Sequence, residues 1–332
     1  MKRNGIAIIA FTENGSKLAE RIRNSLSEKV FSCEKKIQAR DFVCEYFKTA
    51  EAIIFIGACG ICVRMIATLI ETKDADPAVL VIDEKGRFVI SVLSGHLGGA
   101  NALAVKISKI LDAQPVITTA TDINGKFAVD IWTKNNGCRI SDLSKIKYIS
   151  GAILRGDGIG FLCDDFPVSG TLPFKLDSNK PECGICVGLS ADPSPWIKTM
   201  NVIPQIITIG IGCRRGVDPD KLSEFVKSEL QANGISPLSV EAIASIDIKR
   251  DEPAIIKLSE EYDVPLVTYT PEELMSTTGD FSHSDMVEKT TGADNVCERA
   301  CVRQSDGKLI LKKTAKDGMT LAAAVRDWRC EF

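Results

Sequence analysis

Histidine is one of the rarest residues in this chain, with two among 332 residues, and aromatic residues make up only 6% of it. Long apolar runs are also missing, since the longest uncharged one covers residues 52–63 and ends at Arg64. A helix that crosses a membrane needs about 20 apolar residues, so a membrane protein is excluded. The apolar stretch from Ile6 to Phe11 is too short for a signal peptide, which predicts a cytoplasmic protein.

Charge of one sign is not in excess either. Lys and Arg total 41 and Asp and Glu total 44, which gives a net charge of −3. General nucleic-acid binders are usually strongly basic, so that class is excluded as well. The apolar fraction of 45% and the charged fraction of 26% are typical of globular proteins. A chain of this length predicts two domains, or three small ones.

Cysteine is plentiful, because the chain has twelve. Without a secretory signal they are expected to be reduced thiols. Two C-x-x-C pairs, Cys59 with Cys62 and Cys183 with Cys186, lie about 120 residues apart, much farther than in the usual zinc motifs. We therefore expect packing thiols here and no metal site. A metal or iron–sulfur site and a redox pair are the alternatives.

Strand-like and helix-like segments alternate through the first part of the chain. Residues 51–56 form a short apolar segment, as expected for a strand of a parallel sheet that is buried on both faces. Residues 78–82 and 88–93 are expected strands joined by a hairpin turn at 83–86. The other expected elements here are strands at 4–11 and 115–119 and helices at 16–26, 61–69 and 100–111.

The middle of the chain differs, because residues 136–205 contain six prolines. Asp157-Gly158 indicates a hairpin there, and residues 192–195 indicate a stiff linker. The last third alternates again and ends in an expected helix over 320–328. The predicted fold class is α/β, with two α/β domains of mostly parallel sheets joined by a smaller Pro-rich middle region. The predicted domains are residues 1–135, 136–205 and 206–332.

The richest chemistry lies between an expected strand and an expected helix, in the run Ser-Gly-His-Leu-Gly-Gly-Ala-Asn at residues 94–101. Its glycines allow backbone N–H groups to approach a ligand at a helix N-terminus, which favours anions. The run is neither a dinucleotide fingerprint nor a P-loop. His96 stands beyond the carboxyl end of a strand, where α/β sheets place ligands. We therefore expect a functional role for His96 rather than a structural one.

The next strand ends in Thr-Thr-Ala-Thr-Asp at residues 118–122. In a doubly wound sheet this strand end would lie beside the His96 loop and bring Asp122 near the histidine. Helix capping by Thr121 or Asp122 is the alternative for these polar residues.

Cations follow two other turns of the first domain. Arg64 comes after Gly57 and Gly60, and Lys73 lies in the following turn. Both cations would suit an acidic ligand, and solvated surface charge is the alternative.

The last third carries a second set of cations. Arg214 and Arg215 stand in a glycine frame that includes Gly212, which suits bidentate binding of carboxylate or phosphate. Lys249 follows the next expected strand. Glu298 begins a later element, where an acid in the first turn of a helix is the alternative to a functional role.

These strings resemble the CbiG family of cobalamin biosynthesis, over about residues 4–328 and least over 136–205. The C-terminal part also resembles the stand-alone CobE proteins. Cys59, Cys62 and Ala67 stand where the family commonly has other small residues or proline, which argues against essential cysteine ligands. The matching segments are 57–64, 73–83, 86–101, 116–122, 210–216, 245–249 with Glu252, and 296–298.

The resemblance implies a cobalt-precorrin 5A hydrolase of the anaerobic pathway. Such an enzyme opens a δ-lactone on a ring-contracted cobalt corrinoid and cleaves a carbon–carbon bond to release acetaldehyde, which yields cobalt-precorrin 5B. The cobalt belongs to the substrate, so no cofactor of the protein is expected. The expected partner is the corrinoid, and other enzymes of the pathway are further candidates.

The resemblance also suggests roles for the residues. His96 would activate water, with Asp122 and Glu298 as further catalytic candidates, and the amide of Gly98 or Gly99 would hold the oxyanion. A non-catalytic corrinoid carrier is the main alternative, and another enzyme on this scaffold, such as a methyltransferase, is a weaker one. The expected substrate-binding residues are Gly57, Gly60, Arg64, Lys73, Ser94, Gly98, Gly99, Asn101, Thr119, Thr121, Gly212, Arg214, Arg215 and Lys249.

Overall fold

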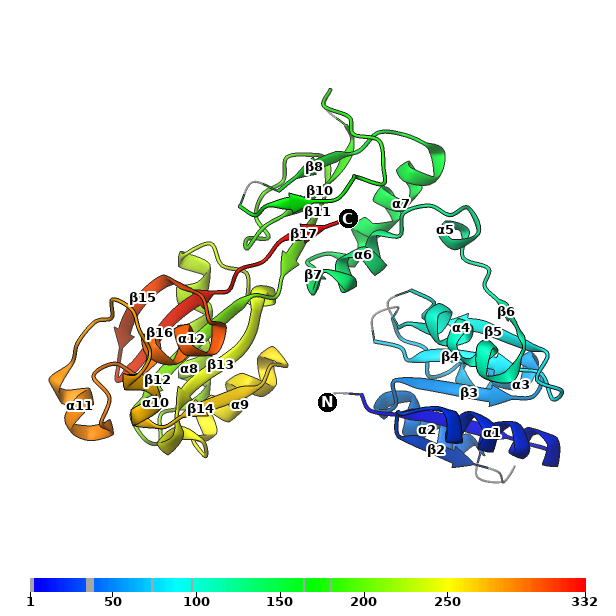
Figure 1. Ribbon diagram of the computed structural model, residues 1–332, viewed down its shortest axis with the longest axis horizontal. Coiled ribbons are helices and arrows are strands. Elements are labelled where there is room, and N and C mark those ends of the chain that lie inside the picture. Colours follow the sequence, from blue (N-terminus) through cyan, green and yellow to red (C-terminus); the bar gives the residue numbers. More distant parts are fainter. Residues whose placement is uncertain (1–2, 34–38, 73–74, 97, 164, 180) are drawn as a thin grey trace. The chain divides into compact units, whose positions relative to one another are not determined.

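The computed structural model describes residues 3–33, 39–72, 75–96, 98–163, 165–179 and 181–332 (Figure 1). Their contacts divide the chain into two compact units, residues 1–131 and 132–332. Each unit contains a mainly parallel sheet covered by helices, so the α/β fold class is confirmed. No helix among the described residues is long and apolar enough to cross a membrane.

The first unit is built on a six-stranded sheet in the order β2-β1-β3-β4-β5-β6. The strands β1 to β4 run parallel, whereas β5 is antiparallel to β4 and β6 is parallel to β5. The carboxyl ends of β5 and β6 therefore lie at the edge of the sheet opposite to those of β1, β3 and β4. The strands are β1 (Ile6–Ala10), β2 (Val30–Cys33), β3 (Ala52–Ile56), β4 (Ala78–Ile82), β5 (Phe88–Leu93) and β6 (Gln114–Val116).

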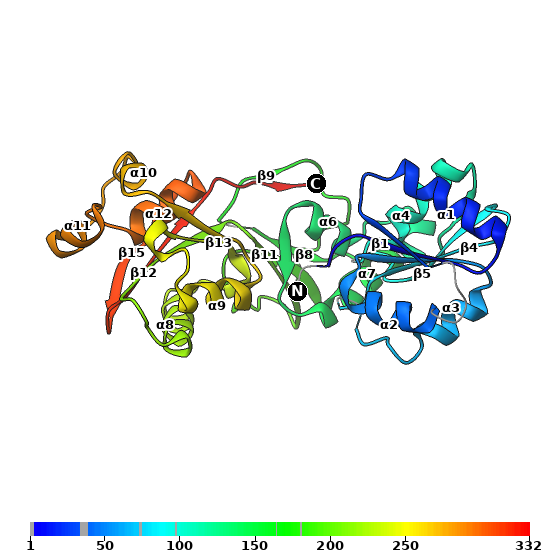
Figure 2. The same ribbon diagram turned by 90° about the horizontal axis from the view of Figure 1, so that it is seen from below.

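Helices cover both faces of this sheet (Figure 2). Because side chains alternate along a strand, Ile6 and Ile8 of β1 pack toward α1 and α4, and Ala7 and Ile9 pack toward α2 and α3. Burial on both faces explains why β1, β3 and β4 are wholly apolar. The helices that cover it are α1 (Glu13–Ser25), α2 (Ala39–Thr49), α3 (Cys59–Ile66) and α4 (Ala100–Leu111). The short helices α5 (Ala120–Ile123) and α6 (Val129–Asn135) follow β6, and α6 spans the boundary between the two units.

The second unit contains a five-stranded sheet in the order β14-β13-β12-β16-β15. Helices α8 and α9 pack on one face and α12 packs on the other (Figure 2). The strands are β12 (Ile207–Cys213), β13 (Val240–Ile246), β14 (Leu266–Tyr269), β15 (Lys308–Lys316) and β16 (Met319–Val325). The helices are α8 (Pro219–Ala232), α9 (Pro253–Tyr262), α10 (Pro271–Met275), α11 (Asp285–Thr291) and α12 (Cys297–Ser305).

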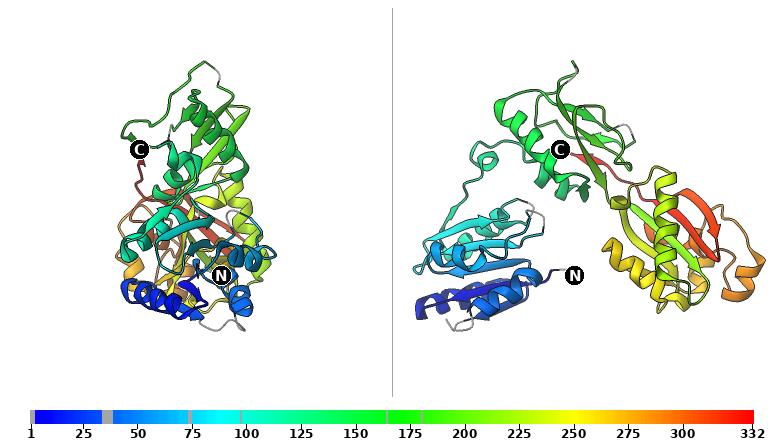
Figure 3. Two further views of the ribbon diagram at one scale, coloured as in Figure 1. Left: turned by 90° about the vertical axis from the view of Figure 1, so that its right-hand side faces the viewer. Right: turned by 180° about the vertical axis from the view of Figure 1, so that it is seen from behind.

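The middle region has a sheet of its own, in the order β7-β11-β10-β8. The boundary expected near residue 205 falls between β11 of this sheet and β12 of the next. The C-terminal strand β17 returns to the middle region and pairs with β9 (Figure 3). The elements are β7 (Cys138–Ile140), α7 (Ile146–Arg155), β8 (Gly160–Leu162), β9 (Val168–Ser169), β10 (Cys183–Val187), β11 (Lys198–Pro204) and β17 (Cys330–Glu331).

Two local predictions are wrong. The helix expected over 320–328 is mostly strand β16, which pairs with both β12 and β15. Its run of alanines favours a helix locally, but burial between two strands overrides that preference. The hairpin expected at Asp157-Gly158 is instead the connection from α7 to β8. Gly156 adopts the left-handed conformation (φ = 80°) that ends α7, so the apolar run before Asp157 is helical.

Candidate functional site

The loop after β5 has a backbone that depends on its glycines. Gly99 has φ = 85° and Ser94, unusually for a residue with a side chain, has φ = 55°. A Cβ atom at Gly98 would collide with the side chain of Ser94. The N–H of Gly99 donates to the carbonyl of His96 at 3.0 Å, so it is already used inside the turn and is not free to hold an oxyanion. These glycines therefore shape the loop that presents His96.

His96 lies between two polar side chains of its own unit. Its Nδ1 is 3.0 Å from Oδ2 of Asp130, and its Nε2 is 3.4 Å from Oγ1 of Thr121. The side chains of His96 and Asp130 are 12% and 11% exposed, so the pair is largely shielded from water. A carboxylate on one ring nitrogen and a hydroxyl near the other is an arrangement suited to proton transfer.

Asp130 is a residue that the sequence interpretation missed. It lies in the first turn of α6, which is 34 residues after His96, and no local motif marks it. Its Oδ1 accepts the N–H of Ile131 at 3.0 Å, which leaves Oδ2 for the histidine. Asp122, the acid expected beside His96, lies in α5, and its side chain is outside the described part of the structure.

The neighbouring polar groups bind one another. Asn101 Nδ2 donates to Thr119 Oγ1 at 3.1 Å, and Ser94 Oγ donates to the carbonyl of Asp76 at 3.2 Å. The strand ends of β5 and β6 therefore meet at one edge, as expected from the sequence. The side chains of Ser94, Asn101 and Thr119 brace this edge, and their role in substrate binding stays a prediction.

The glycine and arginine turn after β3 does not join this cluster. Gly57, Gly60 and Arg64 follow the carboxyl end of β3, and the N–H of Gly57 donates to the carbonyl of Ile82 at the end of β4. Since β5 and β6 run opposite to β3 and β4, the topology puts this turn at the other edge of the sheet. Lys73 lies outside the described residues.

The C-terminal sheet carries a pocket of about 680 Å³ at its strand ends. All four substrate-binding residues expected in this domain line it, namely Gly212, Arg214, Arg215 and Lys249. Two further cations, Lys313 and Lys316 of β15, line the same pocket and were missed by the sequence interpretation.

The rest of the pocket lining is largely apolar. Ile248 and Met286 expose 49% and 77% of their surface, and Val296 and Met319 contribute further apolar atoms. A pocket with five cationic side chains and an apolar wall suits a ligand that combines carboxylates with a hydrophobic ring.

Glu252 fixes the cationic loops of this pocket. Its Oε2 accepts a hydrogen bond from Lys249 Nζ at 3.0 Å, and its Oε1 accepts the N–H of Gly216 at 3.0 Å. The side chain of Glu252 is 3% exposed and that of Lys249 is 11% exposed. One buried carboxylate therefore positions both the arginine loop after β12 and the lysine after β13.

Glu298 is fully buried at the start of α12. Its carboxylate accepts hydrogen bonds from the N–H and hydroxyl of Ser282, from Asn295 Nδ2 and from the N–H of Lys313, at 2.7–2.9 Å. These contacts tie the segment before α11 to β15. The geometry favours a positioning role for Glu298, and its catalytic role stays an untested prediction.

The N-terminal, middle and C-terminal regions of the chain each match a known protein family. Residues 41–122, 127–204 and 207–324 match the families described as Cobalamin synthesis G N-terminal, Cobalamin biosynthesis central region and Cobalamin synthesis G C-terminus. A Cobalt-precorrin-5A hydrolase of Salmonella typhimurium is 35% identical over 98% of this chain and 99% of its own. The chain belongs to the CbiG family. A second Cobalt-precorrin-5A hydrolase, from Priestia megaterium, is 29% identical over 98% of this chain and 96% of its own.

The CobE resemblance is confirmed for part of this CbiG chain. Protein CobE of a Sinorhizobium species is 26% identical over 121 residues, which is 36% of this chain and 79% of that protein.

Three of the four C-x-x-C cysteines of this CbiG chain, Cys62, Cys183 and Cys186, are buried as expected of packing thiols, whereas Cys59 is exposed. Burial raises the pKa of the Cys62 thiol to about 12 and also raises the pKa of Cys183. Cys183 and Cys186 lie three residues apart in β10, so their side chains point to opposite faces of the sheet. Both features disfavour a shared thiolate site.

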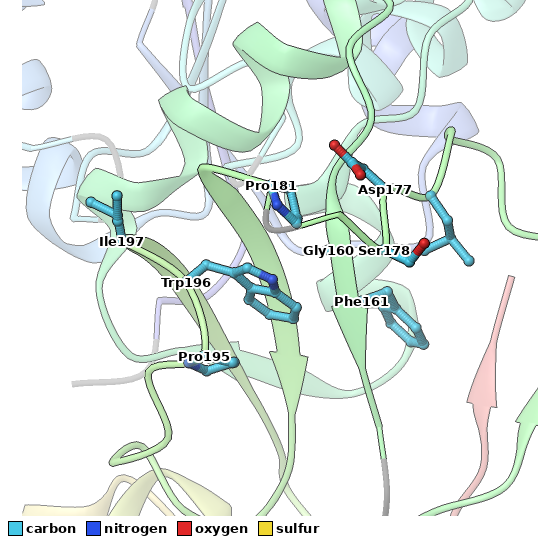
Figure 4. Close-up of a pocket in the computed structure, with 9 residues that line it drawn as sticks. Gly160, Phe161, Asp177, Ser178, Pro181, Pro195, Trp196 and Ile197 are labelled. Atoms are coloured by element: carbon cyan, nitrogen blue, oxygen red, sulfur yellow. The ribbon is translucent and has the colours of Figure 1, made fainter.

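A second pocket, of about 600 Å³, lies in the middle region beside Trp196 (Figure 4). The indole covers Gly160 of β8 and Gly184 of β10, where a Cβ atom would collide with the ring. Among the described residues of its lining, Asp177 is the charged one, and its carboxylate would repel an anionic ligand.

Proposed function

We propose that this chain is a cobalt-precorrin-5A hydrolase, which opens the δ-lactone of its corrinoid substrate and releases acetaldehyde to give cobalt-precorrin 5B. The observation that carries the proposal is the 35% identity to a hydrolase of that name over nearly the whole of both chains. The largely shielded His96 cluster and the cationic pocket provide the two kinds of group that such a reaction needs.

The chemistry is assigned to the edge of the first sheet where β5 and β6 end. His96 serves as the base that takes a proton at Nε2 and returns it to the leaving oxygen. Asp130 holds Nδ1 and so orients the ring, and the imidazolium that forms is stabilised by that carboxylate.

Substrate binding is assigned in part to the C-terminal pocket. A cobalt corrinoid carries many carboxylates around a broad, mostly apolar ring. Arg214 and Arg215 offer guanidinium groups for paired hydrogen bonds, and Lys249, Lys313 and Lys316 add point charges. The apolar wall provides contact for the edge of the ring.

The proposal includes no cofactor held by the protein, because the cobalt enters with the substrate. It also places the enzyme in the cytoplasm, and the eleven cysteines described are free thiols, which fits a reducing compartment. Other enzymes of the pathway are proposed as partners that hand over the substrate or receive the product.

One incubation tests the proposed function. The purified chain is mixed with cobalt-precorrin 5A under anaerobic conditions, and acetaldehyde is measured together with the mass of the corrinoid product. Release of one acetaldehyde per corrinoid supports the hydrolase. Tight binding with an intact lactone would instead identify a corrinoid carrier and overturn the proposal.

A further inference from the structure

We propose that Thr121 is the nucleophile that opens the lactone, and that the reaction passes through an ester on its Oγ1. This inference rests on the function proposed above and adds the attacking atom to it. The observation that carries it is the alignment of three groups from separate segments, with His96 placed 3.0 Å from Asp130 and 3.4 Å from Thr121.

The carboxylate decides which ring nitrogen is the base. Asp130 Oδ2 accepts the proton of Nδ1, so the neutral ring carries its lone pair on Nε2. Thr121 Oγ1 is the hydroxyl near that lone pair. A nucleophile, a base within reach of it and a third group that orients the base are the features of an activated hydroxyl. Such contacts are often long before substrate binds and shorten in the complex.

Helix capping does not account for the Thr121 hydroxyl. A capping threonine accepts a backbone N–H of the helix that it begins. Among the described residues, however, the hydrogen-bond partner of the Thr121 hydroxyl is the imidazole of His96. Thr121 is only 6% exposed, so its hydroxyl is held against the base in a site with little bulk water. This favours the hydroxyl over a free water molecule as the first group to attack.

The two half-reactions balance without an oxidant or a reductant. First, Oγ1 of Thr121 gives its proton to Nε2 and bonds to the lactone carbonyl carbon, and the ring C–O bond then breaks. The leaving oxygen takes the proton from Nε2, which leaves a threonyl ester and a free hydroxyl on the corrinoid. Second, water gives a proton to Nε2 and attacks the ester carbonyl, and Oγ1 leaves with that proton. The sum of these two half-reactions is the addition of one water to the lactone. The hydroxyl-bearing carbon then leaves as the aldehyde carbon of acetaldehyde. Its hydroxyl loses a proton, its bond to the macrocycle breaks, and the macrocycle keeps the electron pair and takes up a proton.

The test compares two substitutions at one position. Thr121→Val keeps the size of the side chain and removes the hydroxyl, whereas Thr121→Ser keeps the hydroxyl. In single-turnover assays of acetaldehyde release, we expect the valine variant to lose about 10³-fold or more and the serine variant to stay within about tenfold of the parent chain. Rapid quenching of the parent chain should trap the ester on the peptide that contains Thr121. Its added mass should equal that of the substrate, or that of the substrate minus acetaldehyde.

The matched control is Thr208→Val. Thr208 is fully buried in β12, and its hydroxyl has no hydrogen-bond partner among the described residues, so loss of that hydroxyl should leave turnover unchanged. Circular dichroism checks that each variant is folded. If Thr121→Val turns over within threefold of the parent chain, Thr121 is not the nucleophile, but the proposed hydrolase function still stands. Equal losses for valine and serine, or an adduct on another residue, would also show that Thr121 is not the nucleophile. A parent chain that releases no acetaldehyde would overturn both proposals.

Discussion

Nδ1 of His96 lies 3.0 Å from Oδ2 of Asp130, although the two residues are separated by 34 positions of the chain. The pair is largely buried, and the other carboxylate oxygen of Asp130, Oδ1, accepts the N–H of Ile131. This geometry fixes both the orientation of the imidazole and the nitrogen that carries its proton.

Replacement of Asp130 by asparagine should therefore slow catalysis without removing the histidine. An asparagine amide can donate to Nδ1, which would place the ring proton on Nε2 and block its use as a base. We expect single-turnover acetaldehyde release to fall by about 10²–10⁴-fold at neutral pH. The acid limb of the pH–rate profile should move to lower pH, because the imidazolium loses a neighbouring negative charge. An unchanged pH profile in a folded Asp130→Asn variant would show that the carboxylate does not act through His96.

Loss of the imidazole itself should remove the base. We expect His96→Ala and His96→Asn each to lose about 10²–10⁴ in turnover, because general acid–base help is worth about that much. Corrinoid binding should survive in both, since the carboxylate contacts are assigned to other residues. Binding is measured by titration of the corrinoid absorbance and turnover by acetaldehyde release. If both variants turn over within threefold of the parent chain, His96 is not the base, and Asp122 and Glu298 become the candidates.

Removal of a guanidinium from the C-terminal pocket should weaken binding. Arg214 lines the pocket. Its backbone N–H donates to the carbonyl of Gly318 at 2.9 Å, so the loop that carries the side chain is anchored. We expect Arg214→Ala to cost roughly 1.5–3 kcal/mol of binding free energy through loss of a charge-assisted hydrogen bond. Corrinoid titration measures the change. Lys227→Ala, which removes an exposed charge from α8 outside the pocket, serves as the control. Equal affinities for both variants would remove Arg214 from the site.

The buried pair of Glu252 and Lys249 should matter for stability as well as for the pocket. Glu252→Gln keeps the shape but leaves the Lys249 ammonium without its buried counter-charge. We expect the free energy of unfolding to fall by about 3 kcal/mol, measured by urea titration. The exposed pair of Lys257 and Asp220 provides the contrast, because Asp220→Asn should change stability little. A Glu252→Gln variant as stable as the parent would show that the pair is not a structural anchor.

The C-x-x-C cysteines are expected to bind no metal. The raised pKa of Cys62 disfavours the thiolate that a metal needs, and Cys183 and Cys186 point to opposite faces of β10. Metal analysis of the purified chain should therefore find no stoichiometric zinc or iron. One metal ion per chain that is lost in a Cys62→Ser/Cys186→Ser variant would contradict this prediction.

The sequence by itself determined the features that depend on neighbours along the chain. Alternating apolar segments predicted the strands and helices, and the glycines before Ala100 predicted the turn that presents His96. The sequence also indicated that Arg214, Arg215 and Lys249 lie together, because each follows the end of a buried strand and parallel strand ends meet at one edge of a sheet. All three line one pocket, and their role in substrate binding stays a prediction. These inferences succeeded because strand periodicity and turn chemistry act over a few residues.

Tertiary structure alone decided what depends on pairing between distant segments. The hairpin before β5 was predicted, but only the strand order shows that it puts Arg64 and His96 at opposite edges of one sheet. Asp130 reaches His96, and Lys313 and Lys316 reach the pocket, because of how α6 and β15 pack. The alanines of β16 form a strand because the ladders on both sides bury them. Such contacts arise from strand direction and packing, which no stretch of a few residues encodes.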